Sequence, residues 1–306
     1  MISEFQIQNY GCVKDATLKL TPLHALIGPN DSGKSTLLRA LRDLLEGRVF
    51  QPKVMRSSET TGDYALKSAT TANGCVLRVV GQSPDGKADS VRLVRFDVEQ
   101  LKQRSSLLDT RTVDVFPSDR GSEIAGIYDA ILNRGDDTFA RINQSVRELF
   151  PSVVNIRLPV QNGQKTLGAK LKNGQEVGAQ EMSEGLLLYL AYAALCEVCK
   201  AGVVLVEEPE NGLHPARVAE VIGMLRELTK RGIQVILTTH SPLVINELQP
   251  DEVSIVTRTE AEGTKVTPIA ATPNFAERAK VYALGELWLS YANGKDEAPL
   301  LNGGAA

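Results

Sequence analysis

The pattern of apolar and polar positions divides the chain into strand-like and helical stretches. Residues 5–8 and 16–20 alternate with a period of two, as half-buried strands do, and residues 23–27 form a continuous apolar strand. A glycine-rich turn follows at once, and from Ser35 onward the apolar residues recur at helical spacing. The start of the chain therefore predicts the order strand, glycine loop, helix.

Further along, the pattern changes from strands to helices and then alternates between the two. It predicts two strands that extend the first sheet, two clear helical stretches and two short strands, at residues 75–80 and 91–96, 124–132 and 139–150, and 155–160 and 166–171. Helix and strand then alternate, with helices at 184–200 and 216–231 and strands at 203–206, 234–238 and 253–256. Such alternation is typical of a mainly parallel α/β sheet. No heptad pattern lasts long enough for coiled-coil arms.

The glycine-rich turn carries the strongest chemical signal. It matches G-x-x-x-x-G-K-[ST] in full, between a strand and a helix, so that successive backbone N–H groups can converge on phosphate oxygens at the positive end of the helix. We expect Lys34 to reach the β- and γ-phosphates, Ser35 to offer its hydroxyl to Mg²⁺ and Thr36 to bind the α-phosphate. The predicted nucleotide-binding residues here are Gly28, Pro29, Asn30, Asp31, Ser32, Gly33, Lys34, Ser35 and Thr36.

Two other strands end in residues that suit ATP hydrolysis. Adjacent side chains on a strand point in different directions, so we expect Glu207 to be the Mg²⁺-side acid and Glu208 to orient or activate water. A solvated acidic loop is the alternative. The strand at 234–238 leads to His240, and ligands bind at the carboxyl ends of strands in open α/β sheets. We therefore expect His240 to contact the γ-phosphate, and Glu208, His240 and Lys34 to be catalytic.

The order of these motifs produces a family resemblance. The P-loop, Glu207-Glu-Pro-Glu-Asn-Gly-Leu-His-Pro215 and Thr238-Thr-His-Ser-Pro242 follow one another as in the ATPases related to RecF, SMC and OLD proteins, a branch of the ABC-ATPase group. The resemblance implies an α/β P-loop NTPase fold, an ABC-type head with a mainly parallel core sheet, an antiparallel β lobe and a helical lobe. It implies one head over 1–306, with approximate lobes 1–97, 98–200 and 201–306, and ATP and Mg²⁺ as cofactors.

In that group two heads pair head to tail, and each completes the other's ATP site through a signature motif that begins a helix. The similar segment here is 182–188, so Ser183 and the Gly185 backbone would touch the γ-phosphate held by a partner copy, which implies a homodimer in the ATP state. Ser183 also looks like an ordinary helix N-cap, and the two roles are compatible. The group's Mg²⁺-contacting glutamine has two candidates, Gln100 and Gln103; Gln100 is taken as the metal residue, and the pattern does not decide between them.

Two differences between this sequence and related protein groups argue against a transporter subunit and against a nuclease. The signature glutamine of transport ABC subunits is absent after Gly185, which argues against a transporter subunit. OLD-type proteins often carry a nuclease domain behind the ATPase, but the 66 residues after His240 lack its length and its clustered acidic pattern. We therefore expect no nuclease activity from this chain itself.

Composition indicates the setting. Four cysteines make no disulfide framework, no apolar run is long enough to cross a bilayer, and the N-terminus lacks a signal pattern. We expect a cytoplasmic protein without a membrane partner. The formal charge is −3, yet residues 39–111 carry 13 Lys and Arg against 9 Asp and Glu. This stretch is either a local nucleic-acid surface or a solvated surface with uneven charge.

Two hypotheses for function follow. The first is an ATP-gated dimerising switch that acts on DNA or RNA, or on a separate nuclease or effector protein, in DNA repair or defence. The alternative is an ATPase that regulates a protein partner without nucleic acid. A small-molecule kinase would explain neither Glu207 and Glu208 nor His240, and the Asn-Lys-x-Asp motif of a GTPase is absent.

Overall fold

The computed structural model describes residues 1–47, 64–70, 75–81, 90–106 and 118–292 of the chain. It divides into two compact units. The first unit comprises Met1–Leu93, Ala201–Glu210 and Arg226–Ala306, and the second comprises Val94–Lys200 and Asn211–Leu225.

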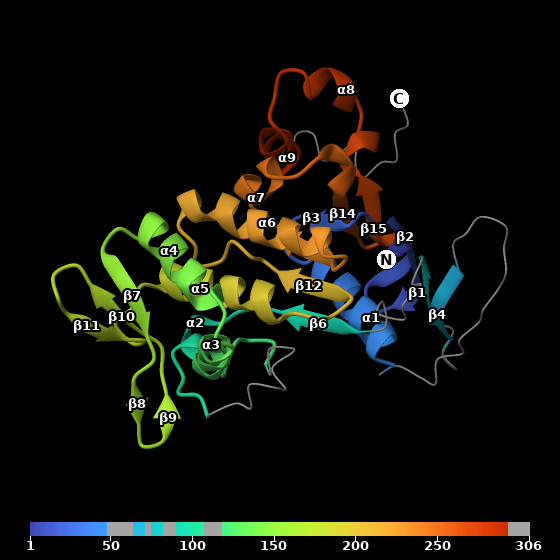
Figure 1. Ribbon diagram of the computed structural model, residues 1–306. Helices are drawn as coiled ribbons and strands as arrows, with labels where there is room; N and C mark the ends of the chain where they lie inside the picture. The colour runs from blue at the N-terminus through green and yellow to red at the C-terminus, as the bar shows by residue number, and fades with distance from the viewer. Residues whose placement is uncertain (48–63, 71–74, 82–89, 107–117, 293–306) are drawn as a thin grey trace. The chain divides into compact units, whose positions relative to one another are not determined.

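A six-stranded sheet forms the centre of the first unit, in the order β15-β14-β3-β13-β12-β6 (Figure 1). Its strands are β3 (Leu23–Ile27), β6 (Val91–Val94), β12 (Val203–Glu207), β13 (Gln234–Thr239), β14 (Val253–Thr259) and β15 (Gly263–Pro268). The pairs β12–β13, β13–β3 and β3–β14 are parallel, and β15 is antiparallel to β14. Every residue of β3 and β13 is buried, as expected for central strands covered on both faces. The mainly parallel core sheet predicted from the sequence is confirmed.

An antiparallel sheet in the order β2-β1-β5-β4 lies in the same unit. Its strands are β1 (Ile2–Tyr10), β2 (Val13–Lys19), β4 (Tyr64–Thr70) and β5 (Val76–Gly81). The strand predicted at 75–80 joins this sheet as β5, but the strand predicted at 91–96 does not. It forms β6 at the edge of the core sheet beside β12, because the backbone N–H groups of Gly202 and Val203 both bond the carbonyl of Ser90 and align the two segments.

Helix α1 (Lys34–Glu46) packs between these two sheets. It contacts β1 and β5 on one side and β12 and β13 on the other. Its leucines at helical spacing are buried, namely Leu37, Leu38, Leu41, Leu44 and Leu45. Burial of each contributes roughly 1.5–3 kcal/mol, so the helix that follows the glycine loop is held firmly in the core.

The rest of the first unit follows β13. It consists of α7 (Pro242–Asn246), the strands β14 and β15, α8 (Phe275–Arg278) and α9 (Leu284–Ala292). Helix α7 packs against α9. Helix α6 (Pro215–Lys230) runs from the second unit into the first. The sequence pattern identified α6 but not α7, α8 or α9, which are short.

The second unit combines helices with small antiparallel sheets. Its helices are α2 (Val98–Leu101), α3 (Ile124–Asn133), α4 (Thr138–Leu149) and α5 (Glu184–Val198). Its strands are β7 (Val153–Arg157), β8 (Val160–Gln161), β9 (Gln164–Lys165), β10 (Gly168–Leu171) and β11 (Glu176–Gly178). Helices α3 and α5 are joined by the buried Tyr128 hydroxyl, which donates to the carbonyl of Leu190 at 2.9 Å. Within the described ranges, the structure has no helix that is long and apolar enough to span a membrane.

Candidate active site

The glycine-rich loop connects the end of β3 to the start of α1, and both of its glycines are required by close contacts. A Cβ on Gly28 would lie 2.2 Å from the carbonyl oxygen of Val256. Gly33 has a φ of 105°, and a Cβ there would lie 2.5 Å from Thr264 Oγ1. Any other residue would push the loop away from its neighbours, so the loop keeps the tight curve expected of a phosphate cradle.

Lys34 stands at the start of α1 with its side chain folded back over the loop. The residue is 6% exposed, and Nζ donates to the carbonyls of Gly28 and Pro29 at 2.8 Å each. Burial lowers the pKa of Lys34 below its ordinary value, and the carboxylates of Glu208, Glu210 and Asp31 oppose this shift. A poorly solvated ammonium group at the mouth of a phosphate cradle is well placed to exchange two carbonyls for phosphate oxygens.

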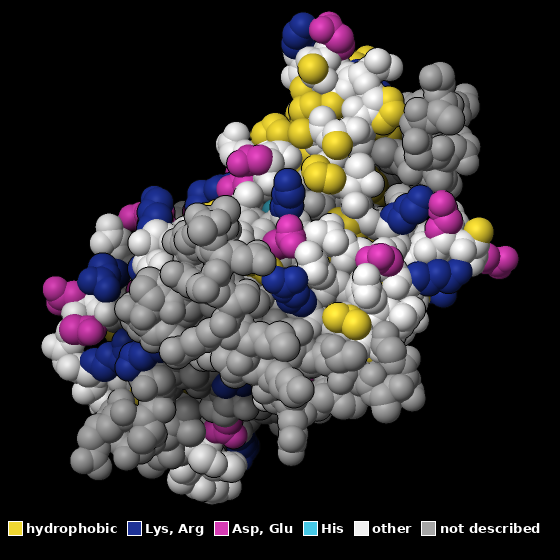
Figure 2. Space-filling model, turned by 90° about the vertical axis from the view of Figure 1, so that its right-hand side faces the viewer, with side chains coloured by type: hydrophobic (Ala, Val, Ile, Leu, Met, Phe, Trp, Pro, Cys, Tyr) yellow, Lys and Arg dark blue, Asp and Glu magenta, His cyan; other side chains and the backbone are white. Residues whose placement is uncertain are grey.

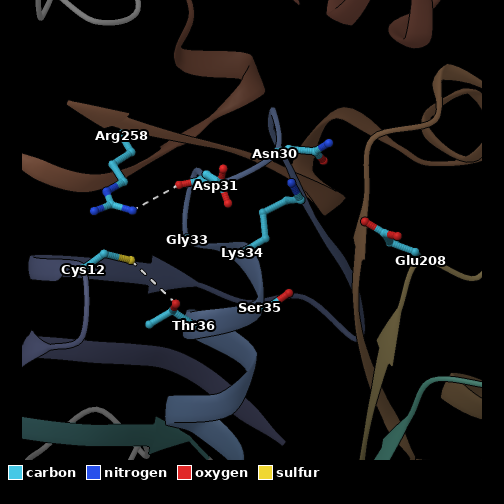
Figure 3. Close-up of a pocket in the computed structure, with 9 residues that line it drawn as sticks. All are labelled: Cys12, Asn30, Asp31, Gly33, Lys34, Ser35, Thr36, Glu208 and Arg258. Atoms are coloured by element: carbon cyan, nitrogen blue, oxygen red, sulfur yellow. Dashed lines mark hydrogen bonds between the residues drawn. The ribbon is translucent and has the colours of Figure 1, made fainter. Parts of the chain in front are cut away.

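A cavity of about 470 Å³ opens over the loop. Its lining residues are Cys12, Asn30, Asp31, Gly33, Lys34, Ser35, Thr36, Glu208 and Arg258. Figure 3 shows Cys12 and Arg258 on one side, Glu208 on the opposite side, and Lys34 and Ser35 between them. The cavity therefore runs from the basic side chain of Arg258 to the acidic side chain of Glu208.

The two predicted acids take different positions at the end of β12. Glu207 is the last residue of the strand and pairs with Thr238. Glu208 has a φ of 47°, in the left-handed region, and its N–H donates to the carbonyl of Thr238 at 2.9 Å. Such a conformation costs a non-glycine residue roughly 1–3 kcal/mol and is concentrated at functional sites. It turns the chain out of the sheet, and the Glu208 side chain lines the cavity.

His240 follows β13, the neighbour of β12, and meets Glu208. Its Nδ1 lies 3.5 Å from Glu208 Oε1 and 3.9 Å from Glu210 Oε1. The His240 side chain is 49% exposed, so its ring remains accessible beside the two carboxylates. The structure thus brings together Lys34, Glu208 and His240, the three residues predicted as catalytic.

Several further residues of this site were not predicted from the sequence. Glu210 accepts a hydrogen bond from Thr239 Oγ1 at 2.6 Å, and its place within the acidic motif was the available signal. Thr264 donates to the P-loop carbonyl of Ser32 at 2.9 Å, and Arg258 Nη1 donates to the carbonyl of Asp31 at 3.5 Å. Thr264 and Arg258 come from a distant hairpin, β14–β15, and nothing in the local sequence marks them.

Cys12, in the turn between β1 and β2, also reaches the loop. Its Sγ lies 3.3 Å from Thr264 Oγ1 and 3.6 Å from Thr36 Oγ1. Burial alone would raise the pKa of this thiol, but hydrogen bonding to Thr264 and Thr36 and the charge of Arg258 bring it below its ordinary value. The thiol is therefore more readily ionised than an ordinary cysteine.

Other predicted site residues belong to the second unit. Ser183 is the N-cap of α5 and its Oγ accepts from the N–H of Leu186 at 3.4 Å, which confirms the predicted cap. Gly185 lies in the first turn of the same helix, and Gln100 lies in α2. Their roles at a nucleotide remain predictions. His214 also has a local role, since its Nδ1 accepts from the N–H of Ala216 at the start of α6.

The basic stretch at 39–111 falls partly outside the described residues, which exclude 48–63, 71–74, 82–89 and 107–117. Its proposed role as a nucleic-acid surface remains a prediction.

The donor set at the cavity suits Mg²⁺. The Ser35 hydroxyl and the Glu208 carboxylate, which line the cavity, and the neighbouring Glu207 at the end of β12 offer the oxygen ligands that this ion prefers. No group of three or more His, Cys, Asp or Glu side chains gathers as a metal cage anywhere in the described chain.

Comparison with known proteins places this site in a family context. A family described as "AAA domain, putative AbiEii toxin, Type IV TA system" matches residues 96–246, and one described as "AAA ATPase domain" matches residues 1–121. An OLD nuclease of Thermus scotoductus is 24% identical over 321 residues, covering 79% of this chain and 59% of that protein. A protein of Streptomyces coelicolor named "Putative ABC transporter ATP-binding protein" is 25% identical over 281 residues, covering 91% of this chain and 39% of its own length.

The fold is shared with an SMC head solved in complex with the C-terminal winged-helix domain of ScpA. The TM-score is 0.57 at 17% sequence identity, over 87% of this chain and 96% of that one. The present chain spans less than two thirds of the two curated relatives, so their whole-protein activities do not transfer directly. The matched ATPase domains and the sequence relatives show that the chain is an ATPase, and its fold is similar to that of an SMC head.

Proposed function

We propose that the chain hydrolyses ATP with Mg²⁺ in the cavity over the P-loop, as a switch that drives two copies together. The observation that carries this proposal is the cavity itself, which joins the P-loop to Glu208 and places Glu208 beside His240. The γ-phosphate lies toward Glu208, and the α-phosphate and nucleoside lie toward Thr36, Cys12 and Arg258.

Each residue then has one task. Backbone N–H groups of the P-loop hold the β-phosphate, and Lys34 spans the β- and γ-phosphates. Ser35 and Glu207 would hold Mg²⁺, which would supply neutralisation of the developing phosphate charge. Glu208 orients the attacking water and accepts its proton, and His240 donates to the γ-phosphate.

Two substitutions test the catalytic roles. Glu208→Gln keeps ATP binding and slows hydrolysis by a factor on the order of a hundred or more, because the amide orients water but accepts no proton. Lys34→Ala weakens ATP binding itself. Glu227→Gln is the matched control, because it makes the same change at an exposed carboxylate. Unchanged turnover in Glu208→Gln would remove Glu208 from the mechanism.

ATP-driven pairing rests on the direction from which the γ-phosphate is approached. Lys34 and Ser35 follow β3, Glu208 follows β12 and His240 follows β13, three strands whose carboxyl ends share one sheet edge. Ser183 caps a separate helix, where an N–H group and a hydroxyl can be offered to the γ-phosphate of a second copy. ATP then becomes part of the interface, and ADP favours the monomer.

Sedimentation of Glu208→Gln with ATP and with ADP measures this pairing. We expect dimer with ATP and monomer with ADP. Ser183→Arg blocks pairing and hydrolysis and spares ATP binding, while Ser152→Arg, at an exposed site of the same unit, changes neither. The same mass in both nucleotide states, with normal hydrolysis in Ser183→Arg, would contradict the signature role.

We propose a nuclease or effector protein as the partner of the switch. Large apolar side chains are exposed on the segment around α7, α8 and α9, namely Leu243, Val281, Tyr282 and Leu289. Figure 2 shows hydrophobic side chains gathering at the top of the view, over the region of α8 and α9 in Figure 1, and intermixed charges elsewhere on that face. Exposed apolar groups favour contacts with another protein.

Nucleic acid is the second candidate, because residues 39–111 carry a local excess of basic side chains. Binding of a labelled DNA duplex at about 50 mM salt, with ATP, decides between the two. ATP-dependent binding that falls steeply with salt favours nucleic acid. No binding supports a protein partner alone.

A further inference from the structure

Glu210 is buried against the end of β13, next to the proposed catalytic residues. Its side chain is 9% exposed. Oε1 accepts a hydrogen bond from Thr239 Oγ1 at 2.6 Å and a longer one from the His240 N–H at 3.4 Å. Glu210 therefore holds the chain by hydrogen bonds at Thr239 and His240, the two residues where the chain leaves the sheet.

Thr239 adds a hydrogen bond to Ser241, the residue that follows His240 along the chain. Its hydroxyl donates to Glu210 and accepts from the N–H of Ser241 at 2.9 Å. Helix α7 begins immediately afterwards, at Pro242. The backbone from Thr239 to Ser241, with His240 at its centre, is thus fixed by one carboxylate and one buried hydroxyl.

The two carboxylates near His240 act on different parts of it. Glu208 is the nearer to the ring, at 3.5 Å from Nδ1, whereas Glu210 stands 3.9 Å from Nδ1 and bonds the backbone instead. Glu208 lines the cavity, and Glu210 is not among the residues that line it. Glu210 is therefore placed to hold His240, and Glu208 is placed to face the nucleotide.

The carboxylate of Glu210 lowers the folding stability of the chain, because one of its oxygens is buried without a hydrogen bond. Among the buried side-chain nitrogen and oxygen atoms of the described ranges, its Oε2 is one of few that make no hydrogen bond. A buried unsatisfied polar atom costs roughly 1–3 kcal/mol, and an apolar side chain of similar shape would avoid that cost. Packing alone therefore does not explain a glutamate here, and a site that tolerates such a cost is commonly functional.

From this geometry we infer that Glu210 is a positioning residue of the ATPase, which fixes His240 through Thr239 and the His240 N–H so that the imidazole meets the γ-phosphate. The inference rests on the proposed contact between His240 and the γ-phosphate. Displacement of a reacting group by about 1 Å can cost up to a hundredfold in rate. Loss of the hydrogen bonds that Glu210 accepts therefore lowers kcat. It does not move the P-loop, so the ATP affinity is unchanged.

The test compares Glu210→Ala with Glu210→Gln. The glutamine retains a carbonyl oxygen that accepts from Thr239 Oγ1 and the His240 N–H, and the alanine retains no acceptor. We expect kcat to fall by on the order of tenfold or more in Glu210→Ala and to stay within about threefold of wild type in Glu210→Gln. The dissociation constant for ATP stays within about threefold in both.

A second pair of variants approaches the same contact from the other side and does not depend on the folding of Glu210→Ala. Thr239→Val removes the hydroxyl from a residue that is 0% exposed, and Thr239→Ser retains it. We expect Thr239→Val to lose kcat as Glu210→Ala does and Thr239→Ser to keep it. Both changes break the hydrogen bond between Glu210 and Thr239, so their losses should not multiply. We expect the double variant Glu210→Ala, Thr239→Val to be slower than the slower single variant by no more than about threefold.

The inference is overturned if kcat is normal in Glu210→Ala, or if Glu210→Gln and Glu210→Ala lose kcat equally. It is also overturned if the kcat losses of the two single variants multiply in the double variant, or if ATP affinity falls in proportion to kcat. Glu208→Gln, measured in parallel, separates this inference from the proposed function. If Glu208→Gln hydrolyses ATP normally, the proposed role of Glu208 fails. If Glu208→Gln loses hydrolysis while Glu210→Ala does not, only the role of Glu210 fails.

Discussion

Replacing Thr264 by valine tests how the β14–β15 hairpin supports the P-loop. Thr264 is 0% exposed, and its hydroxyl donates to the carbonyl of Ser32 at 2.9 Å. Valine has nearly the same shape but no donor, so the buried carbonyl loses its partner at a cost of roughly 1–3 kcal/mol in folding free energy. A methyl group also needs about 3.3 Å from a carbonyl oxygen, so the loop must shift by a few tenths of an ångström.

The shift reaches the nucleotide because Ser32 lies inside the P-loop, between Gly28 and Lys34. Successive N–H groups must converge on the same phosphate, and their alignment is lost as the loop moves. We expect Thr264→Val to bind ATP about three- to tenfold more weakly, and tenfold corresponds to about 1.4 kcal/mol. Titration with a fluorescent ATP analogue measures the affinity, and urea unfolding without nucleotide measures the stability.

A matched control exists in the same unit. Thr272 is 5% exposed and its hydroxyl donates to the carbonyl of Ile269 at 2.7 Å, outside the nucleotide cavity. The Thr272 hydroxyl also bonds the buried Tyr291 hydroxyl at 2.9 Å, so Thr272→Val should lose stability as well, without any loss of ATP affinity. Thr264→Ser should bind ATP as wild type does. The reasoning is refuted if Thr264→Val loses stability but binds ATP normally, because Thr264 would then serve folding alone.

Two further predictions use the pKa shifts. The ring nitrogens of buried His24 bond Thr21 and Ser254, and burial lowers its pKa from 6.5 to about 4. The unfolded state therefore binds the proton more readily than the folded state. Up to about 3 kcal/mol of folding stability that is present above pH 6.5 is lost as the pH falls toward 4. His24→Asn should therefore flatten the dependence of urea unfolding on pH between 7 and 5, and an unchanged slope would contradict the assignment. Cys12 should react with iodoacetamide faster than the other cysteines because its pKa is lowered, and bound ATP should slow this reaction. Mass spectrometry measures the labelling, with Cys12→Ser as the control. A labelling rate that does not change with ATP would place the nucleoside elsewhere.

Much of the site follows from local sequence. The P-loop pattern, the acidic pair at the end of one strand and His240 at the end of another each depend on a strand followed by particular residues, and the periodicity of the chain identifies those strands. Parallel strands with their carboxyl ends at one edge then bring Lys34, Glu208 and His240 together. The structure places these residues as that reasoning predicts.

The fold of the middle of the chain was less predictable. The sequence predicts a strand at both 75–80 and 91–96, yet β5 joins the antiparallel sheet and β6 joins the core sheet. Periodicity reports that a segment is a strand and which face it buries. It does not report the neighbouring strand, which depends on backbone bonds such as those from Gly202 and Val203 to Ser90.

The sequence by itself determined that this chain binds a nucleotide phosphate, because the P-loop is a local structure: its glycines, lysine and serine act within one strand, one turn and one helix. Only the tertiary structure decided what surrounds that loop. Cys12 comes from the first hairpin and Thr264 and Arg258 from the last, and Glu210 grips His240 from a neighbouring strand end. These contacts join residues far apart in the chain, and their energy appears only once the sheet has closed, so no local pattern of residues records them.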